Sequence, residues 1–236
     1  MLCAFFLGFL FSVQTNAEWR ADGFAALATD YVYRGYSVGD GKPTPKLNLT
    51  LSNSRNGFFA GLWLAKTDIA GLSDASQGSR RDVETELSLG YTWFLNNEWS
   101  FSGSYNWLEY FRNHQPRDTD YGEYRLGLHY TDRFSLLSSY TNSQWNTDTG
   151  SSSVSAVQRF SIPFNILGET ELGVVFLNRS DTLQYEFLRL SFGAVIKSDL
   201  SVAVEYTYSG GELRDFLEDD RIGNRFTFSV TRHFSF

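Results

Sequence analysis

Charged side chains recur at every second position of segments that are otherwise small or polar, and such groups could bind or sort solutes. Glu84 and Glu86 are two residues apart, and so are Glu123 and Arg125. Alternate residues of a β-strand point to one face, so each pair would share a face. The ten charged residues that we assign to this face are Asp30, Arg34, Lys46, Glu84, Glu86, Glu123, Arg125, Arg159, Arg189 and Glu205.

This set is balanced, with five acidic and five basic residues, and two interpretations stay open. The charges can line a constriction that binds and sorts small polar solutes, as rings of charged side chains do in selective pores. Alternatively, acids and bases pair across the lumen and fill it. The candidate pore-lining residues are Arg34, Glu84, Glu86, Glu123, Arg125, Arg159, Arg189 and Glu205.

Catalytic and metal chemistry has little support in the sequence. A serine hydrolase needs a histidine beside a serine and a third group that orients it. The three histidines are His114, His129 and His233, and none stands in such a pattern. The single cysteine, Cys3, lies at the N-terminus, so a transition-metal site is not expected. We predict no catalytic residue, no metal and no cofactor.

The elements that would position these charges are β-strands. The segment 83–93 places Val83, Leu87, Leu89 and Trp93 on one face and Glu84 and Glu86 on the other. Period-two alternation of this kind is typical of half-buried strands. It recurs in twelve segments, near 24–34, 45–52, 57–66, 83–93, 99–107, 120–130, 134–141, 153–162, 170–178, 184–196, 200–209 and 225–236. In the segment 57–66 both faces are apolar, so its orientation is not assigned.

The connections favour a transmembrane barrel. Short turns at 53–56, 96–98, 131–133 and 197–199 alternate with longer polar segments, except that 163–169 and 179–183 are of similar length. Outer-membrane barrels have short periplasmic turns, longer external loops and an even strand number. Aromatic residues make up 17% of the chain and gather near the expected strand ends, as in aromatic girdles. Those near the longer connections are Tyr33, Trp107, Tyr110, Tyr121, Tyr140 and Tyr208. We therefore predict an all-β fold, a single closed antiparallel barrel of about twelve strands.

The N-terminus has the pattern of a secretory signal peptide. Leu2 to Val13 is an apolar run too short to span a bilayer as a helix, and small residues at Thr15 and Ala17 suit cleavage after Ala17. The predicted division is a signal peptide at 1–17 and an outer-membrane barrel domain at 18–236. No Lys or Arg precedes the apolar run, which leaves the start codon open. The chain is acidic, with a net charge of −7, and this argues against nucleic acid as a partner.

The last segment resembles the C-terminal strand of outer-membrane proteins. Phe226, Phe228, Val230, Phe234 and Phe236 share one face, and the sequence ends on Phe236. The resemblance implies recognition of Phe236 by the barrel-assembly machinery. It also implies location in the bacterial outer membrane, with lipid and lipopolysaccharide as neighbours. No stripe of residues predicts an oligomeric state.

Residues 25–95 resemble the TorF type of short porins. The matching motifs are Asp30-Tyr31-Val32-Tyr33-Arg34-Gly35-Tyr36-Ser37, Asp40-Gly41-Lys42-Pro43, Gly57-Phe58-Phe59-Ala60-Gly61-Leu62-Trp63, and Glu84-x-Glu86 followed by Gly90-Tyr91. The sequence departs from the family at Leu64-Ala65-Lys66, where small polar residues are expected. The resemblance implies an outer-membrane barrel with a channel role and gives no solute.

The function expected from these patterns is passive or weakly selective diffusion of small hydrophilic solutes. One alternative is a non-conducting surface barrel that acts as a binding or structural protein. A lipid-modifying outer-membrane enzyme is the third hypothesis. Inward Ser, Thr, Gly and Asn residues favour the channel because they leave room for water, whereas the mixed inward Arg and Glu residues favour a filled barrel.

Overall fold

The computed structural model describes residues 19–68, 82–112, 115–116, 120–143, 150–178, 183–210 and 221–236. The predicted signal peptide, residues 1–17, lies outside these residues, and so does His114. The described residues form strands and turns only. No described helix is long and apolar enough to cross a membrane.

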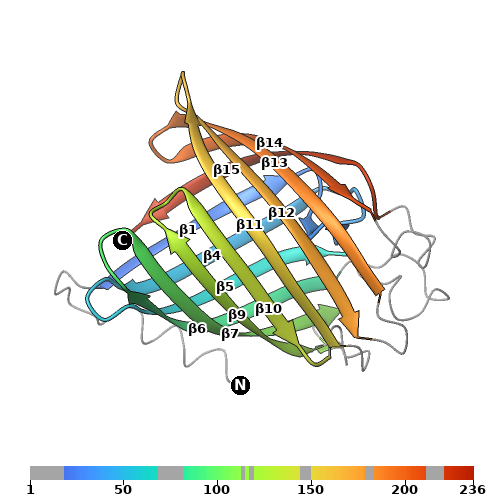
Figure 1. Cartoon of the computed structure of the whole chain (residues 1–236). Helices are drawn as coiled ribbons and strands as arrows, with labels where there is room; N and C mark the ends of the chain where they lie inside the picture. The colour runs from blue at the N-terminus through green and yellow to red at the C-terminus, as the bar shows by residue number, and fades with distance from the viewer. Residues whose placement is uncertain are drawn as a thin grey trace.

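Twelve long strands form one closed antiparallel sheet, which Figure 1 shows as a tilted barrel. They are β1 (Trp19–Ala28), β4 (Thr44–Asn53), β5 (Phe58–Thr67), β6 (Asp82–Phe94), β7 (Trp99–Arg112), β9 (Tyr121–Tyr130), β10 (Phe134–Thr141), β11 (Gly150–Ile162), β12 (Ile166–Asn178), β13 (Leu183–Lys197), β14 (Leu200–Ser209) and β15 (Arg225–Ser235). The first and last strands pair with each other, which closes the sheet. The predicted fold class is confirmed.

Three two-residue strands lie outside this series. They are β2 (Val32–Tyr33), β3 (Tyr36–Ser37) and β8 (Gln115–Pro116). Strands β2 and β3 pair only with each other, within the connection from β1 to β4, whereas β8 pairs with the end of β7. The connection between β1 and β4 thus contains a small hairpin of its own.

The short turns all lie at one end of the barrel. They join β4 to β5, β6 to β7, β9 to β10, β11 to β12 and β13 to β14 (Figure 1). Gly57, in the first of these turns, has a φ of 79°, and a Cβ there would collide with the carbonyl oxygen of Thr92. A glycine is therefore required here, by the positive φ and by the close approach of β6.

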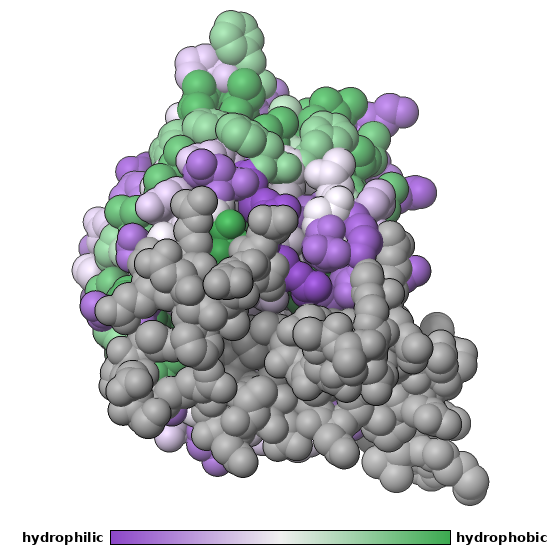
Figure 2. All heavy atoms as spheres, turned by 90° about the vertical axis from the view of Figure 1, so that its right-hand side faces the viewer, coloured by the Kyte–Doolittle hydropathy of each residue, from purple (hydrophilic) through white to green (hydrophobic). Residues whose placement is uncertain are grey.

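The register assigns the two faces of every strand. Leu62 of β5 lies opposite Leu49 of β4 and Leu87 of β6, so the three side chains share the outer face. This settles the orientation of β5, in which Trp63 and Ala65 point into the lumen. Large apolar side chains are exposed over the whole outer face, among them Leu27, Leu89, Leu126, Leu172 and Phe228. Figure 2 shows hydrophobic side chains on the outside at the top of the view and hydrophilic ones nearer the middle.

The first strand differs from its prediction. The sequence predicts a strand over 24–34, but β1 begins at Trp19 and ends at Ala28. The alternation continues past Ala28 because the β2–β3 hairpin, which follows directly, also has extended backbone. Asp30 and Arg34 therefore belong to a connection inside the barrel and not to its wall.

Candidate functional site in the barrel lumen

The tip of the β2–β3 hairpin is a tight two-residue turn. Tyr33 pairs with Tyr36, and the two residues between them, Arg34 and Gly35, have φ values of 48° and 84°. Positive φ at both positions is typical of a type I′ turn, in which a non-glycine residue is uncommon. A Cβ on Gly35 would come within 2.7 Å of Ser209 Cβ and 2.8 Å of Phe187 Cβ. The tip is thus packed closely against β13 and β14, on the inside of the barrel.

Asp30 fixes the base of the hairpin. Its carboxylate accepts hydrogen bonds from the hydroxyl of Ser37 at 2.8 Å and from the backbone amides of Tyr31 at 2.7 Å and Gly41 at 3.2 Å. Lys42 then donates to Asp40 and Asp68, and these hydrogen bonds raise the pKa of the Lys42 ammonium. Asp30, predicted as a lumen charge, is therefore used to hold the loop in shape.

Glu123 of β9 holds the hairpin tip from the opposite wall. Arg34 Nη1 and Nη2 donate to its two carboxylate oxygens at 2.8 and 3.0 Å, and Tyr33 donates its hydroxyl at 3.3 Å. Arg125 donates to the same carboxylate. Bidentate pairing between guanidinium and carboxylate is strong and geometrically specific. The hairpin therefore spans the lumen from β14 to β9.

Glu86 continues this network along the wall. Its two carboxylate oxygens each accept from Arg125 at 2.7 Å. Arg125 thus lies between Glu86 and Glu123, and four of the predicted residues form one connected group.

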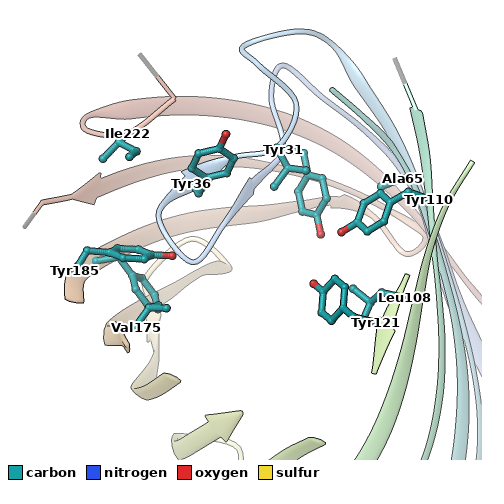
Figure 3. Close-up of a cluster of buried hydrophobic side chains, with 11 residues drawn as sticks. Tyr31, Tyr36, Ala65, Leu108, Tyr110, Tyr121, Val175, Tyr185 and Ile222 are labelled. Atoms are coloured by element: carbon teal, nitrogen blue, oxygen red, sulfur yellow. The ribbon is translucent and has the colours of Figure 1, made fainter. Parts of the chain in front are cut away.

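Glu84 has a different environment. It accepts hydrogen bonds from the Tyr31 hydroxyl at 3.1 Å, the Trp63 indole at 3.0 Å and the Tyr110 hydroxyl at 3.0 Å. These aromatic residues belong to a buried cluster, and Figure 3 shows Tyr31 beside Tyr110 with Tyr121 nearby. The cavity next to them has a volume of about 10 Å³, room for one water molecule at most. Glu84 therefore anchors the hairpin and has little contact with the lumen water.

A second charged group surrounds Arg189 on the other side of the lumen. Arg189 forms ion pairs with Glu205 and Glu171 at 3.1 Å each and with Glu169. Arg159 pairs with Glu169 at 2.6 Å. The sequence prediction lacks Glu169 because the predicted strand begins at 170, whereas β12 begins at Ile166. Glu171 lies within the predicted strand, and alternation alone could have assigned it to the inner face. With these two residues the acidic groups outnumber the basic ones.

Between the two charged groups lies a cavity of about 440 Å³. This volume falls within the range of small-molecule sites, about 300–1,000 Å³. The cations on its surface are Arg34, Lys46, Arg125 and Arg189, and the carboxylates are Glu171 and Glu205. The same surface is rich in serine, with Ser102, Ser104, Ser139, Ser153 and Ser155. Of the eight predicted pore-lining residues, four contribute to the surface of this cavity, namely Arg34, Arg125, Arg189 and Glu205. The other four do not, and these are Glu84, Glu86, Glu123 and Arg159.

Both described histidines contact serine. His129 lies 2.9 Å from the Ser102 hydroxyl and 2.9 Å from that of Ser135, and His233 lies 2.9 Å from Ser201. Ser135 also accepts from Arg159 at 3.3 Å. A catalytic histidine is oriented by a carboxylate or amide that stabilises its cationic form, and no described carboxylate bonds to His129. Within the described residues no three His, Cys, Asp or Glu side chains gather to hold a metal.

Comparison with solved structures supplies the fold relationship. The chain is similar to the KdgM porin, with a TM-score of 0.53 at 10% identity over 91% of this chain and 99% of that one. The same porin in complex with disordered oligogalacturonate gives a TM-score of 0.55 at 11% identity over 91% and 99%. An outer membrane channel from Pseudomonas putida F1 gives 0.55 at 9% identity over 93% and 95%. The fold is that of outer-membrane channels. No protein-family model and no curated protein matches the sequence.

Proposed function

We propose that this chain is a porin-like channel of the bacterial outer membrane that passes small hydrophilic solutes by passive or weakly selective diffusion. The observation that carries the proposal is the polar cavity of about 440 Å³ inside a closed sheet whose outer face is apolar. In lipid every backbone group must be paired within the protein, and a closed barrel satisfies this condition. The outer leucine and phenylalanine side chains would contact acyl chains and, at the outer leaflet, lipopolysaccharide.

Two further parts of the proposal come from the sequence. We propose that residues 1–17 are a cleaved signal peptide and that 18–236 form the mature barrel. We also propose membership of the TorF type of short porins. The family motif around Asp30 to Ser37 builds the inward hairpin, and Trp63 and Glu84, both in the family motifs, bond to each other. A role for these residues in the architecture supports the family proposal.

Single-channel recording in planar bilayers tests the channel. The mature chain, refolded in detergent, should migrate faster on SDS gels unheated than boiled, which confirms a closed barrel before recording. Folded protein should then give discrete conductance steps. Folded protein that stays silent at all voltages would reject the channel.

A non-conducting barrel is the second candidate, because one specific observation favours it. The hairpin crosses the lumen and is held by the bidentate pair between Arg34 and Glu123. In that case the lumen charges stabilise the barrel, and the function lies in its external surface. The same recordings separate the two candidates, and neither requires catalysis.

Phe236→Ala is expected to reduce assembly in cells without reducing the stability of the folded barrel. The Phe236 side chain is 84% exposed, and the residue joins β1 through backbone hydrogen bonds, which alanine keeps. If Phe236 is an assembly signal, the amount of barrel in the outer membrane should fall while refolding in detergent stays normal. Phe164→Ala, an exposed aromatic residue in the β11–β12 turn, is the control. Equal outer-membrane levels for both variants would contradict the signal.

A further inference from the structure

The ion pairs of the lumen share one orientation. In the pairs formed by Arg34, Arg125, Arg159 and Arg189 the arginine side chain is more exposed than its carboxylate partner. Arg125 is 31% exposed against 14% for Glu86, and Arg189 is 28% against 16% for Glu171. The order is the same for Arg34 with Glu123 and for Arg159 with Glu169. A long guanidinium side chain extends over a carboxylate that stays nearer the wall. Each pair therefore presents its positive end to the lumen water.

Lys46 adds a cation that is not neutralised by direct pairing. Its ammonium group lies 4.6 Å from the centre of the Tyr31 ring, and no described carboxylate lies within ion-pair distance of it. The lysine projects from β4 and contributes to the surface of the cavity. Four cationic groups and two carboxylates thus reach that surface, and Arg189 binds both carboxylates.

We infer that the cavity is a binding site for small hydrophilic anions, such as carboxylates or phosphates, and that the channel prefers anions although the chain carries a net charge of −7. This inference rests on the proposed channel function. An ion in the cavity experiences the nearer charges most strongly, because the Coulomb energy falls with distance and the more distant charges are screened. The serine hydroxyls on the cavity surface, among them Ser102, Ser104 and Ser153, can donate hydrogen bonds to anion oxygens.

The test is the reversal potential of the folded full mature chain in a gradient of potassium chloride. We expect a chloride-to-potassium permeability ratio above one. Lys46→Gln should lower this ratio by about twofold or more, because a unit charge beside the path changes the energies of anion and cation in opposite directions. Lys66→Gln is the matched control, since Lys66 lies opposite Val83 on the outer face and should leave the ratio unchanged.

Gluconate and glucose test the solute class, since they have the same carbon skeleton length and differ in charge. Gluconate is expected to reduce the chloride current at a lower concentration than glucose does. In Lys46→Gln the two inhibiting concentrations should lie closer together. A conducting channel that prefers potassium would overturn the anion site, and so would equal inhibition of the chloride current by gluconate and glucose. Either result would leave the proposed channel function standing. An unchanged ratio in Lys46→Gln would overturn the role of Lys46. A folded but silent barrel would instead reject the proposed function.

Discussion

Shortening the inward hairpin is expected to raise the single-channel conductance severalfold. The tip of the hairpin reaches Glu123 on one side and packs against Phe187 and Ser209 on the other, so it occupies the cross-section of the lumen. Replacing residues 32–37 with Asn-Gly would remove Arg34 and both flanking tyrosines. Tyr31 and Val38 already share a backbone hydrogen bond of 2.7 Å, so a two-residue type I′ turn can close the chain between them.

The matched control for this deletion is Arg34→Lys. Lysine keeps the charge but cannot form the bidentate pair with Glu123. The variant therefore tests how far this pair fixes the hairpin tip, without removing the hairpin. Conductance should rise in the order wild type, Arg34→Lys, shortened hairpin. The gel shift on heating confirms that each variant is a closed barrel. If the shortened barrel conducts like the wild type, the narrowest point lies elsewhere, and the Arg189 group becomes the candidate.

The sequence was sufficient to predict the barrel because period-two alternation is a local property. Apart from β5, whose two faces are both apolar, each strand shows its own apolar stripe, as Leu87, Leu89 and Trp93 do in β6. Together the twelve strands form one closed sheet. The alternation also assigns four charged residues to one face, and the structure places them in the lumen: Glu84, Glu86, Glu123 and Arg125. These assignments need no knowledge of long-range contacts.

The hairpin could not be predicted in the same way. Its two strands are extended, so the alternation of β1 continues through Val32 and Tyr33 without interruption. A type I′ turn is usually recognised from Asn-Gly or Asp-Gly, and here arginine occupies the first position. The positive φ of Arg34 is maintained by tertiary contacts, above all by Glu123, which is 89 residues away. A local pattern contains no information about such a partner.

The tyrosines illustrate a second limit. Trp107, Tyr140 and Tyr208 lie on the outer face near the longer connections, as predicted for an aromatic girdle. The sequence predicts Tyr33, Tyr110 and Tyr121 in the same girdle, but the structure places them inside the barrel. Tyr110 is four residues from Asn106 in β7, so the two side chains point to the same face, and Asn106 faces the lumen. The alternation of β7 alone therefore assigns Tyr110 to the lumen. The girdle prediction for these tyrosines uses only their closeness to the strand ends and not the face to which they point.

Glu123→Ala is expected to destabilise the folded barrel by about 3 kcal/mol, because removal of one partner of a buried ion pair leaves its charges uncompensated. Glu123 is 2% exposed and accepts from Arg34, Arg125 and Tyr33. Without it Arg34 loses its described carboxylate partner, and Arg125 keeps only Glu86. The expected result is a lower urea midpoint for unfolding in lipid vesicles, with the unchanged slope that indicates the same folded state.

Glu169→Ala is the matched comparison, since Glu169 also pairs with two arginines. Its partner Arg159 is exposed to the lumen water, and water can replace much of what the carboxylate provides. We therefore expect a loss of about 1 kcal/mol or less. Combining Glu123→Ala with Arg34→Ala should cost less than the two single changes added together, by about 1 kcal/mol or more, because the second change removes the charge that the first one stranded. Strict additivity would mean that the hairpin is held in the lumen by its aromatic contacts and not by this pair.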